Sequence, residues 1–133
     1  MSKEYRITTL IKIFSNGVKT KKDIEFSSDL NKALKQVDFN EKDLEYVNIL
    51  SYIIPSDGGC EELFDEEYYI GTIVDKSELT DFEISHAICG RNALIYVEDI
   101  EGYVRSESGK IYMYLKGDNV LNPEKIKENN FAI

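Results

Sequence analysis

Two residue types in this chain are typical of nucleophilic catalysis, a cysteine and a histidine. Cys60 follows Gly58-Gly59, where a loop would expose its thiol, and His86 is the single histidine. The carboxylates that surround Cys60 raise the pKa of a thiol and weaken it as a nucleophile. His86 has no Cys or His at ligand spacing, and Cys89 falls on an apolar helical stripe as a core residue would. We therefore assign no catalytic residue.

Acidic and aromatic residues alternate in the middle of the chain, where five carboxylates lie within seven residues. The spacing does not match a calcium-binding EF-hand loop, so we expect no metal ion and no cofactor. Tyr side chains bury area while keeping a polar tip, which favours them in protein interfaces. The residues predicted to contact a partner are Glu61, Glu62, Phe64, Asp65, Glu66, Glu67, Tyr68 and Tyr69.

A second group of residues is suited to binding an anionic small molecule or a nucleotide. An Arg fork beside an aromatic ring recognises phosphate or carboxylate groups, and this alternative site comprises Phe82, Arg91, Asn92 and Arg105. Neither of the glycine-rich phosphate-binding patterns occurs, since Gly58-Gly59 is not followed by Lys. In so acidic a region, both arginines also suit internal ion pairs.

The charge of the chain is strongly segregated along its length. The formal net charge is −9, and residues 37–107 alone carry four Lys/Arg against eighteen Asp/Glu. Residues 1–36 carry eight Lys/Arg against four Asp/Glu. Binding nucleic acid requires neutralising phosphates with cations, and anionic membranes repel the same field. The balance thus favours a basic protein partner and disfavours direct nucleic-acid or membrane binding.

Length and composition indicate one globular domain, residues 1–133, of a cytoplasmic protein. A chain of 133 residues is long enough to bury a core without disulfides. No apolar run is long enough to cross a membrane, the first residues do not resemble a signal peptide, and two cysteines fit a reducing compartment. The abundance of Lys, Ile, Asn and Glu is typical of an AT-rich bacterial or phage genome.

The N-terminal part is predicted to form a β-hairpin over residues 5–26. Apolar residues alternate on both sides of Asn16-Gly17, which suits a two-residue type I′ turn. That turn would pair Ile13 with Thr20 and place Lys19 and Lys21 on the solvent face. A short helix should follow, capped by the cluster 27–29 and ending near residue 38.

Two strands and an acidic loop are predicted next. Residues 46–54 form an apolar run of β-formers that ends at Pro55. The acidic stretch 57–67 then reads as a loop that feeds a strand over residues 68–74. Gly71 inside that strand indicates a bulge or a close approach of another backbone.

The C-terminal half contains a helix start, a single strand and a second hairpin. Thr80 and Glu83 form a capping box, with the helix running to a C-terminal Gly90. Residues 93–97 are predicted to be a strand, and residues 103–115 a hairpin with a four-residue loop. Residues 117–119 should break that strand, and Asn122-Pro123 is a strong helix start.

These elements predict an α+β fold: a mostly antiparallel sheet built from two β-hairpins plus single strands, with two or three short helices packed on it. The leading functional hypothesis is a small acidic, non-enzymatic binding protein that inhibits or neutralises a basic partner such as a nuclease, a toxin or a nucleic-acid enzyme. Immunity proteins, antitoxins and phage inhibitors act in this way, some by imitating the phosphates of a nucleic acid. The alternatives are the nucleotide-binding domain above and an enzyme that uses scattered carboxylates. The oligomeric state is left open.

Overall fold

The computed structural model describes residues 4–91 and 94–129, with side chains described up to Ile126 in the last helix. The described chain confirms the predicted α+β class, with strands in two sheets and short helices. Its strands are β1 Tyr5–Phe14, β2 Lys19–Ile24, β3 Leu44–Ile54, β4 Glu61–Ile70, β5 Thr72–Val74, β6 Ile88–Cys89, β7 Ile100–Arg105, β8 Ile111–Leu115 and β9 Asn119–Leu121. Its helices are α1 Leu30–Leu34, α2 Asp81–Ser85 and α3 Pro123–Asn129, with single 3₁₀ turns η1 Lys76–Glu78 and η2 Val97–Asp99.

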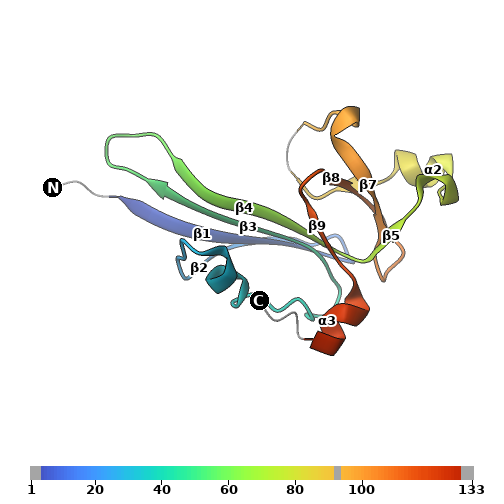
Figure 1. The fold of residues 1–133 in the computed structure, drawn as a ribbon, viewed down its shortest axis with the longest axis horizontal. Helices are drawn as coiled ribbons and strands as arrows, with labels where there is room; N and C mark the ends of the chain where they lie inside the picture. The colour runs from blue at the N-terminus through green and yellow to red at the C-terminus, as the bar shows by residue number, and fades with distance from the viewer. Residues whose placement is uncertain (1–3, 92–93, 130–133) are drawn as a thin grey trace.

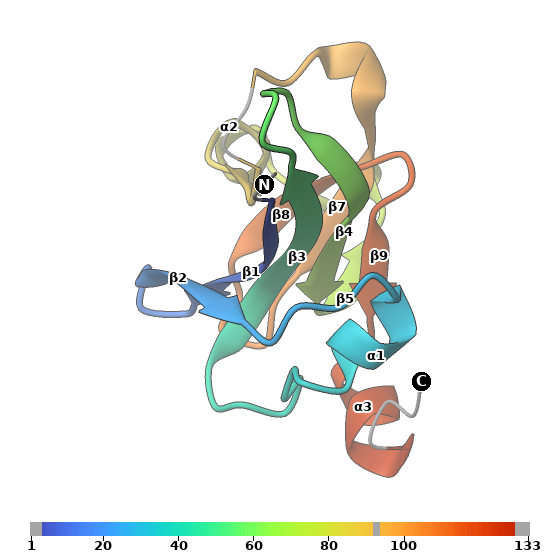
Figure 2. The same cartoon turned by 90° about the vertical axis from the view of Figure 1, so that its left-hand side faces the viewer.

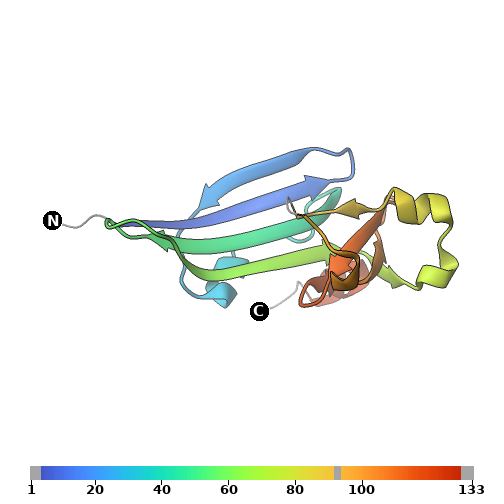
Figure 3. The same ribbon diagram turned by 90° about the horizontal axis from the view of Figure 1, so that it is seen from above.

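The strands form a long five-stranded sheet, sheet A, and a smaller four-stranded one, sheet B. Sheet A has the order β2-β1-β3-β4-β9, and sheet B the order β5-β7-β8-β6. Both are mixed, because β4 pairs with β9 and β6 with β8 in parallel, whereas the other pairs are antiparallel. Figures 1 and 3 show sheet B at one end of sheet A. The prediction of a single, mostly antiparallel sheet is thus refined to two mixed sheets.

The first hairpin is confirmed, but its predicted register is wrong by one residue. Ile13 pairs with Lys19 rather than with Thr20. The backbone N–H of Phe14 donates to the carbonyl of Val18 at 3.0 Å, so the loop holds three residues and ends at Gly17, whose φ is +85°. Such a loop needs one left-handed residue, which Gly supplies. This one-residue change in register places Lys19 and Lys21 on the same face of the hairpin as Ile13 and Ile11, instead of on the opposite, solvent-exposed face.

The predicted register of the second hairpin, β7–β8, is also wrong by one residue, again because the loop length differs from the predicted one. The expected four-residue loop is a three-residue loop that ends at Gly109, with φ of +92°. The N–H of Ser106 donates to the carbonyl of Lys110 at 2.9 Å, and Tyr103 pairs with Met113. In both hairpins the loop has three residues and ends at a glycine with a left-handed conformation, whereas the predicted loops had two and four residues.

The acidic stretch is a strand and not the predicted loop. β4 begins at Glu61 and pairs with β3 along most of its length, with a register shift opposite Ser51 and Tyr52. The predicted strand over residues 68–74 is instead the end of β4 and the separate β5. A Cβ atom on Gly71 would lie 2.4 Å from the carbonyl oxygen of Arg105, which confirms the predicted close backbone approach.

Two further predictions in the C-terminal half are wrong, and a third is correct but incomplete. The helix that begins at Asp81 ends at Ser85, so Gly90 is not its C-terminal cap, and β6 follows instead. Residues 94–96 form no strand and lead into η2, whereas residue 93 lies outside the described residues. The predicted break after the second hairpin is confirmed, since β8 ends at Leu115 and a turn follows, but its last residue, Asn119, already begins β9, a short strand that the sequence pattern did not reveal.

The helix starts agree with the local signals. Asp29 caps α1, Thr80 and Glu83 form the capping box of α2, and the side chain of Asn122 accepts from the N–H of Glu124 at 2.9 Å. Each cap satisfies backbone N–H groups that a helix start leaves free. Local side-chain chemistry therefore placed all three helix starts.

The core is divided into three clusters by the two sheets. One face of sheet A packs against α1 and α3 through Ala33, Leu34 and Ile126, and Figure 2 shows both helices on that side. A second cluster of Tyr46, Tyr69, Val104 and Tyr112 joins the two sheets. A third lies between sheet B and the segment of α2 and contains Leu79, Tyr103 and Ile111. The junction of the sheets is thus rich in buried tyrosines, which need hydrogen-bond partners there.

Candidate protein-binding surface

The eight residues predicted to contact a partner all lie on β4, but the strand divides them by depth. Glu61, Glu62 and Asp65 are exposed, and Phe64 and Glu66 are half-buried. Glu67, Tyr68 and Tyr69 are buried, with Tyr69 fully inaccessible. β4 starts at a free end of sheet A and runs into the junction with sheet B, so its second half is covered on both faces. A partner that meets the folded chain contacts only the first half directly.

The buried end of β4 carries a polar cluster that joins four segments of the chain. Glu67 accepts a hydrogen bond from the hydroxyl of Tyr46, and the side-chain amide of Asn48 donates to it at 3.2 Å. Arg91 places its Nε atom 3.8 Å from the Glu67 carboxylate and pairs through Nη2 with Asp118. The cluster connects β3, β4, the segment after β6 and the turn before β9.

Burial controls the ionisation of Glu67. Removal from water raises the pKa of its carboxyl from 4.5 to about 7, while Arg91 lowers it, Asp118 raises it and Lys19 lowers it. Desolvation thus outweighs the two nearby cations. A shallow hollow of about 250 Å³ opens beside this cluster and is lined by Lys19, Asn48 and Asp65 among others. Two basic residues, Lys19 and Arg91, and two acidic ones, Asp65 and Glu67, line the hollow, so it has no clear preference for an anionic or a cationic ligand.

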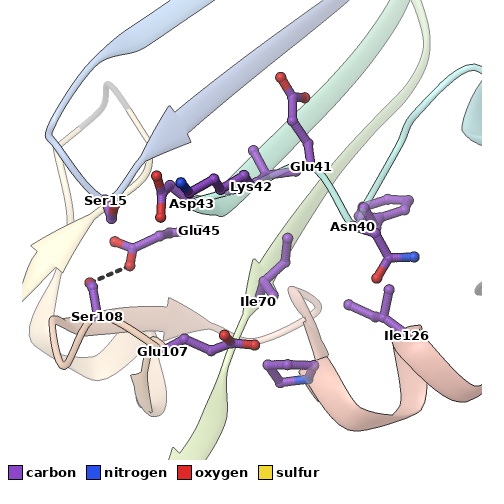
Figure 4. A pocket seen from close by; sticks show the side chains of 13 residues that line it. Ser15, Asn40, Glu41, Lys42, Asp43, Glu45, Ile70, Glu107, Ser108 and Ile126 are labelled. Atoms are coloured by element: carbon purple, nitrogen blue, oxygen red, sulfur yellow. Dashed lines mark hydrogen bonds between the residues drawn. The ribbon is translucent and has the colours of Figure 1, made fainter.

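A second buried carboxylate, Glu45, lines a larger hollow formed by the segment before β3, the β7–β8 loop and α3. Tyr112 donates to it at 2.7 Å, and Ser108 donates to its other oxygen. Figure 4 shows the Glu45 carboxylate directed at Ser108 rather than into the open space. The hollow measures about 340 Å³, and Asp43 on its wall has a φ of +67°, an uncommon conformation for a residue other than Gly. Glu45 therefore acts as an internal anchor of the β7–β8 hairpin.

The substitution Tyr112→Phe tests that anchor. Removing the hydroxyl leaves a buried carboxylate with one donor fewer, which should cost about 2 kcal/mol of unfolding free energy. Urea denaturation followed by circular dichroism measures the loss. Tyr114→Phe is the matched control on the same strand, and we expect a change below about 0.5 kcal/mol. Equal effects of the two substitutions would contradict the anchoring role of Glu45.

The alternative ligand residues do not gather in one place. The Arg105 guanidinium lies 3.3 Å from Glu83, which is itself engaged in the capping box of α2. Arg91 is held by Asp118, and Phe82 stacks on His86 with ring centroids 4.1 Å apart. Asn92 lies outside the described residues. Both arginines are thus ion-pair partners within the chain, and the nucleotide site stays a prediction.

The histidine and the two cysteines lie on separate segments of the chain. Nδ1 of His86 is 2.9 Å from the carbonyl oxygen of Phe82 on its own helical turn. Cys60 is exposed just before β4, and Cys89 is half-buried in β6. Within the described ranges, no three His, Cys, Asp or Glu residues are grouped closely enough to hold a metal ion. No helix in the described part of the chain has the length and apolar character needed to span a bilayer.

Many surface carboxylates form no ion pair with any of the described residues. The ion pairs found among the described residues use Glu4, Glu41, Glu67, Glu83 and Asp118 as their acids. The exposed acids outside these pairs include Asp57, Glu61, Glu62, Asp65, Asp75, Glu78, Asp81, Glu98, Asp99 and Glu101. Exposed lysines occur on β2, which is separated from β4 by β1 and β3 in sheet A. The acidic field predicted from the sequence is therefore present on the surface.

The first half of β4 is also an open sheet edge. β9 pairs only with Tyr68, Tyr69 and Ile70, so no described strand covers residues 61–67 on that side. An open edge presents unpaired backbone N–H and C=O groups that an extended chain can bind. Exposed carboxylates on such an edge select for a basic chain and repel an acidic one.

A group of exposed apolar side chains was not expected from the sequence. Leu94 and Val97 are 80% and 82% exposed, and Ile73 and Tyr96 are 58% and 57% exposed. The run of β-formers at 93–97 was predicted to be a strand, but its described residues 94–97 pair with no strand of sheet B. The one usable signal was the acidic segment directly after Val97, which makes burial of this run costly.

Comparisons of the chain with protein-family models, with curated proteins and with solved structures found no match.

Proposed function

We propose that this chain is a non-enzymatic acidic protein that binds a basic protein partner and neutralises its activity. The observation that carries the proposal is the set of exposed carboxylates between Asp57 and Glu101 that take part in none of the ion pairs found among the described residues. Unpaired charges of one sign raise the rate at which an oppositely charged partner associates and exclude partners of like charge. A basic nuclease, toxin or other nucleic-acid enzyme presents the complementary surface.

Rigid presentation supports the proposal. Glu61, Glu62 and Asp65 lie on a strand that is hydrogen-bonded to β3, so their positions are set by the sheet. A preorganised surface loses less conformational entropy on binding than a mobile loop does. The open edge of β4 adds backbone groups to the same surface, which allows an extended basic segment to pair there.

The triple substitution Glu61→Gln, Glu62→Gln and Asp65→Asn tests the proposal. The wild-type chain, immobilised at low salt, should retain a basic protein that elutes as the salt concentration rises. That protein is identified by mass spectrometry, purified, and assayed for binding and for inhibition of its activity. We expect the triple variant to bind it at least tenfold more weakly, with a smaller dependence on salt.

The matched control removes three charges outside the acidic middle, by Glu4→Gln, Glu25→Gln and Glu124→Gln. All three residues are exposed, and we expect less than a threefold change in affinity. If both variants lost the same affinity for the basic protein, binding would depend only on the net charge of the chain and not on the position of the β4 carboxylates. A triple variant that self-associates in sedimentation yet keeps its affinity would show that the β4 acids only protect the edge from pairing, and would contradict the proposal.

A further inference from the structure

Exposed apolar side chains lie beside a groove at sheet B. Ile73 of β5 and Val97 of η2 both line a hollow of about 310 Å³, whose walls also include Val74, Ile100 and Tyr103. Leu94 and Tyr96, which precede Val97 in the chain, are exposed as well. Figure 1 shows the segment that leads into β7 above the strands of sheet B. We call Ile73, Leu94, Tyr96 and Val97, together with this hollow, the sheet B groove.

The floor of the groove is formed by Tyr114 and Gly102. A Cβ atom at Gly102 would lie 2.7 Å from the hydroxyl oxygen of Tyr114 and 2.9 Å from its ring, so the tyrosine packs directly on the glycine. The strands pair these two residues side by side. The groove is therefore a built feature of sheet B, with an aromatic floor and apolar walls, as is typical of pockets that receive a side chain.

The rim of the groove is acidic. Asp75 and Glu101 belong to its lining, and Glu98 and Asp99 are exposed between Val97 and Ile100. Lys76 is the single basic residue among the lining residues. An apolar centre within a charged rim has the arrangement of a protein interface, in which the centre excludes water and the rim selects the partner by charge.

We infer that the sheet B groove docks a basic segment of the partner protein by taking up one apolar side chain between Ile73 and Val97 while flanking Lys or Arg residues meet the acidic rim. This inference rests on the proposed function and names where the partner is anchored. A second copy of this chain is a poor occupant, because a two-fold contact would bring the two acidic rims together. An anionic membrane surface is repelled for the same reason.

Two synthetic octapeptides test the inference on the intact protein. One alternates Lys and Leu, and the other alternates Lys and Ser, so that the charges are equal and only one carries apolar side chains. We expect the Lys-Leu peptide to bind at least tenfold more tightly. Titration of ¹⁵N-labelled protein should shift the amide signals of residues 73–76 and 97–102 at lower peptide concentrations than those of residues 61–65.

The double variant Ile73→Ser and Val97→Ser should reduce the affinity for the Lys-Leu peptide at least tenfold. Both side chains are more than half exposed, so the core is untouched. Val18→Ser is the matched control, since Val18 is 49% exposed beside the first hairpin loop, at the far end of the strand order. Its affinity should stay within twofold of that of the wild type.

Several results would overturn the inference. Equal binding of the two peptides would leave only charge attraction, and signal shifts confined to residues 61–65 would place the contact on β4. A dimer in sedimentation that the double variant abolishes would make a second copy the occupant. Each of these results leaves the proposed function intact, provided that the triple variant of Glu61, Glu62 and Asp65 still binds the basic protein more weakly than the wild type does. Failure to retain any basic protein would instead refute the proposed function whatever the peptides do.

Discussion

The substitution Gly90→Ala should destabilise the protein by about 3 kcal/mol. A Cβ atom at this position would lie 2.3 Å from Cε2 of Tyr46 and 2.6 Å from Cζ of the same ring. Tyr46 is 1% exposed and packs against Tyr69 with ring centroids 4.9 Å apart, so it has no room to retreat. The N–H of Gly90 also donates to the hydroxyl of Tyr69 at 3.2 Å. Thermal and urea denaturation measure the loss.

Gly17→Ala is the control that separates contact from backbone strain. Gly17 has φ of +85°, and a methyl group on its Cα atom would have no heavy atom within 4 Å, so Ala there should cost about 1 kcal/mol from conformation alone. The φ of Gly90 lies outside the left-handed region, so its cost arises from contact. A Gly90→Ala protein as stable as Gly17→Ala would contradict the close packing of the two sheets.

The substitution Glu67→Gln should change how stability depends on pH. The carboxyl has a pKa of about 7 in the folded protein and 4.5 when unperturbed, because burial disfavours its charge. Between these pH values the folded state binds more protons than the unfolded state. Stability of the wild type should therefore fall as the pH rises from about 4.5 to about 7, and level off above that.

Glu67→Gln removes this loss because its amide stays neutral. Relative to the wild type, we expect the variant to gain about 2 kcal/mol of unfolding free energy between pH 5 and pH 8, allowing for the remaining solvent contact. Urea denaturation at both pH values measures the difference. Glu62→Gln, on the exposed part of the same strand, should show no such gain. A Glu67→Gln difference that is the same at both pH values would show that Arg91 compensates the charge fully.

Local chemistry explains which parts of the fold were predictable. The capping residues Asp29, Thr80 and Asn122 act within three residues of themselves, so the sequence alone locates the helix starts. The hairpins were predictable as well, because alternation and a Gly-containing turn are local. Their registers were not, since the residues of a turn do not select between loops that differ by one residue.

Non-local pairing explains what was missed. β9 has three residues, and it is a strand only because β4 offers an edge for parallel pairing. Residues 94–97 have the composition of a strand but belong to no strand pair among the described residues, and Leu94, Tyr96 and Val97 remain exposed. The availability of a pairing partner depends on segments far away in the chain, which no local pattern records.

The sequence by itself determined the acidic field, the lack of a catalytic motif and the α+β class, because composition and periodicity carry that information. The tertiary structure decided which acidic residues are surface and which are core. Glu61 and Glu67 are six residues apart on one strand, yet one is exposed and the other is 5% exposed. The physical reason is that sheet B covers only the far end of β4, so identical side chains on one strand meet water in one place and buried tyrosines in the other.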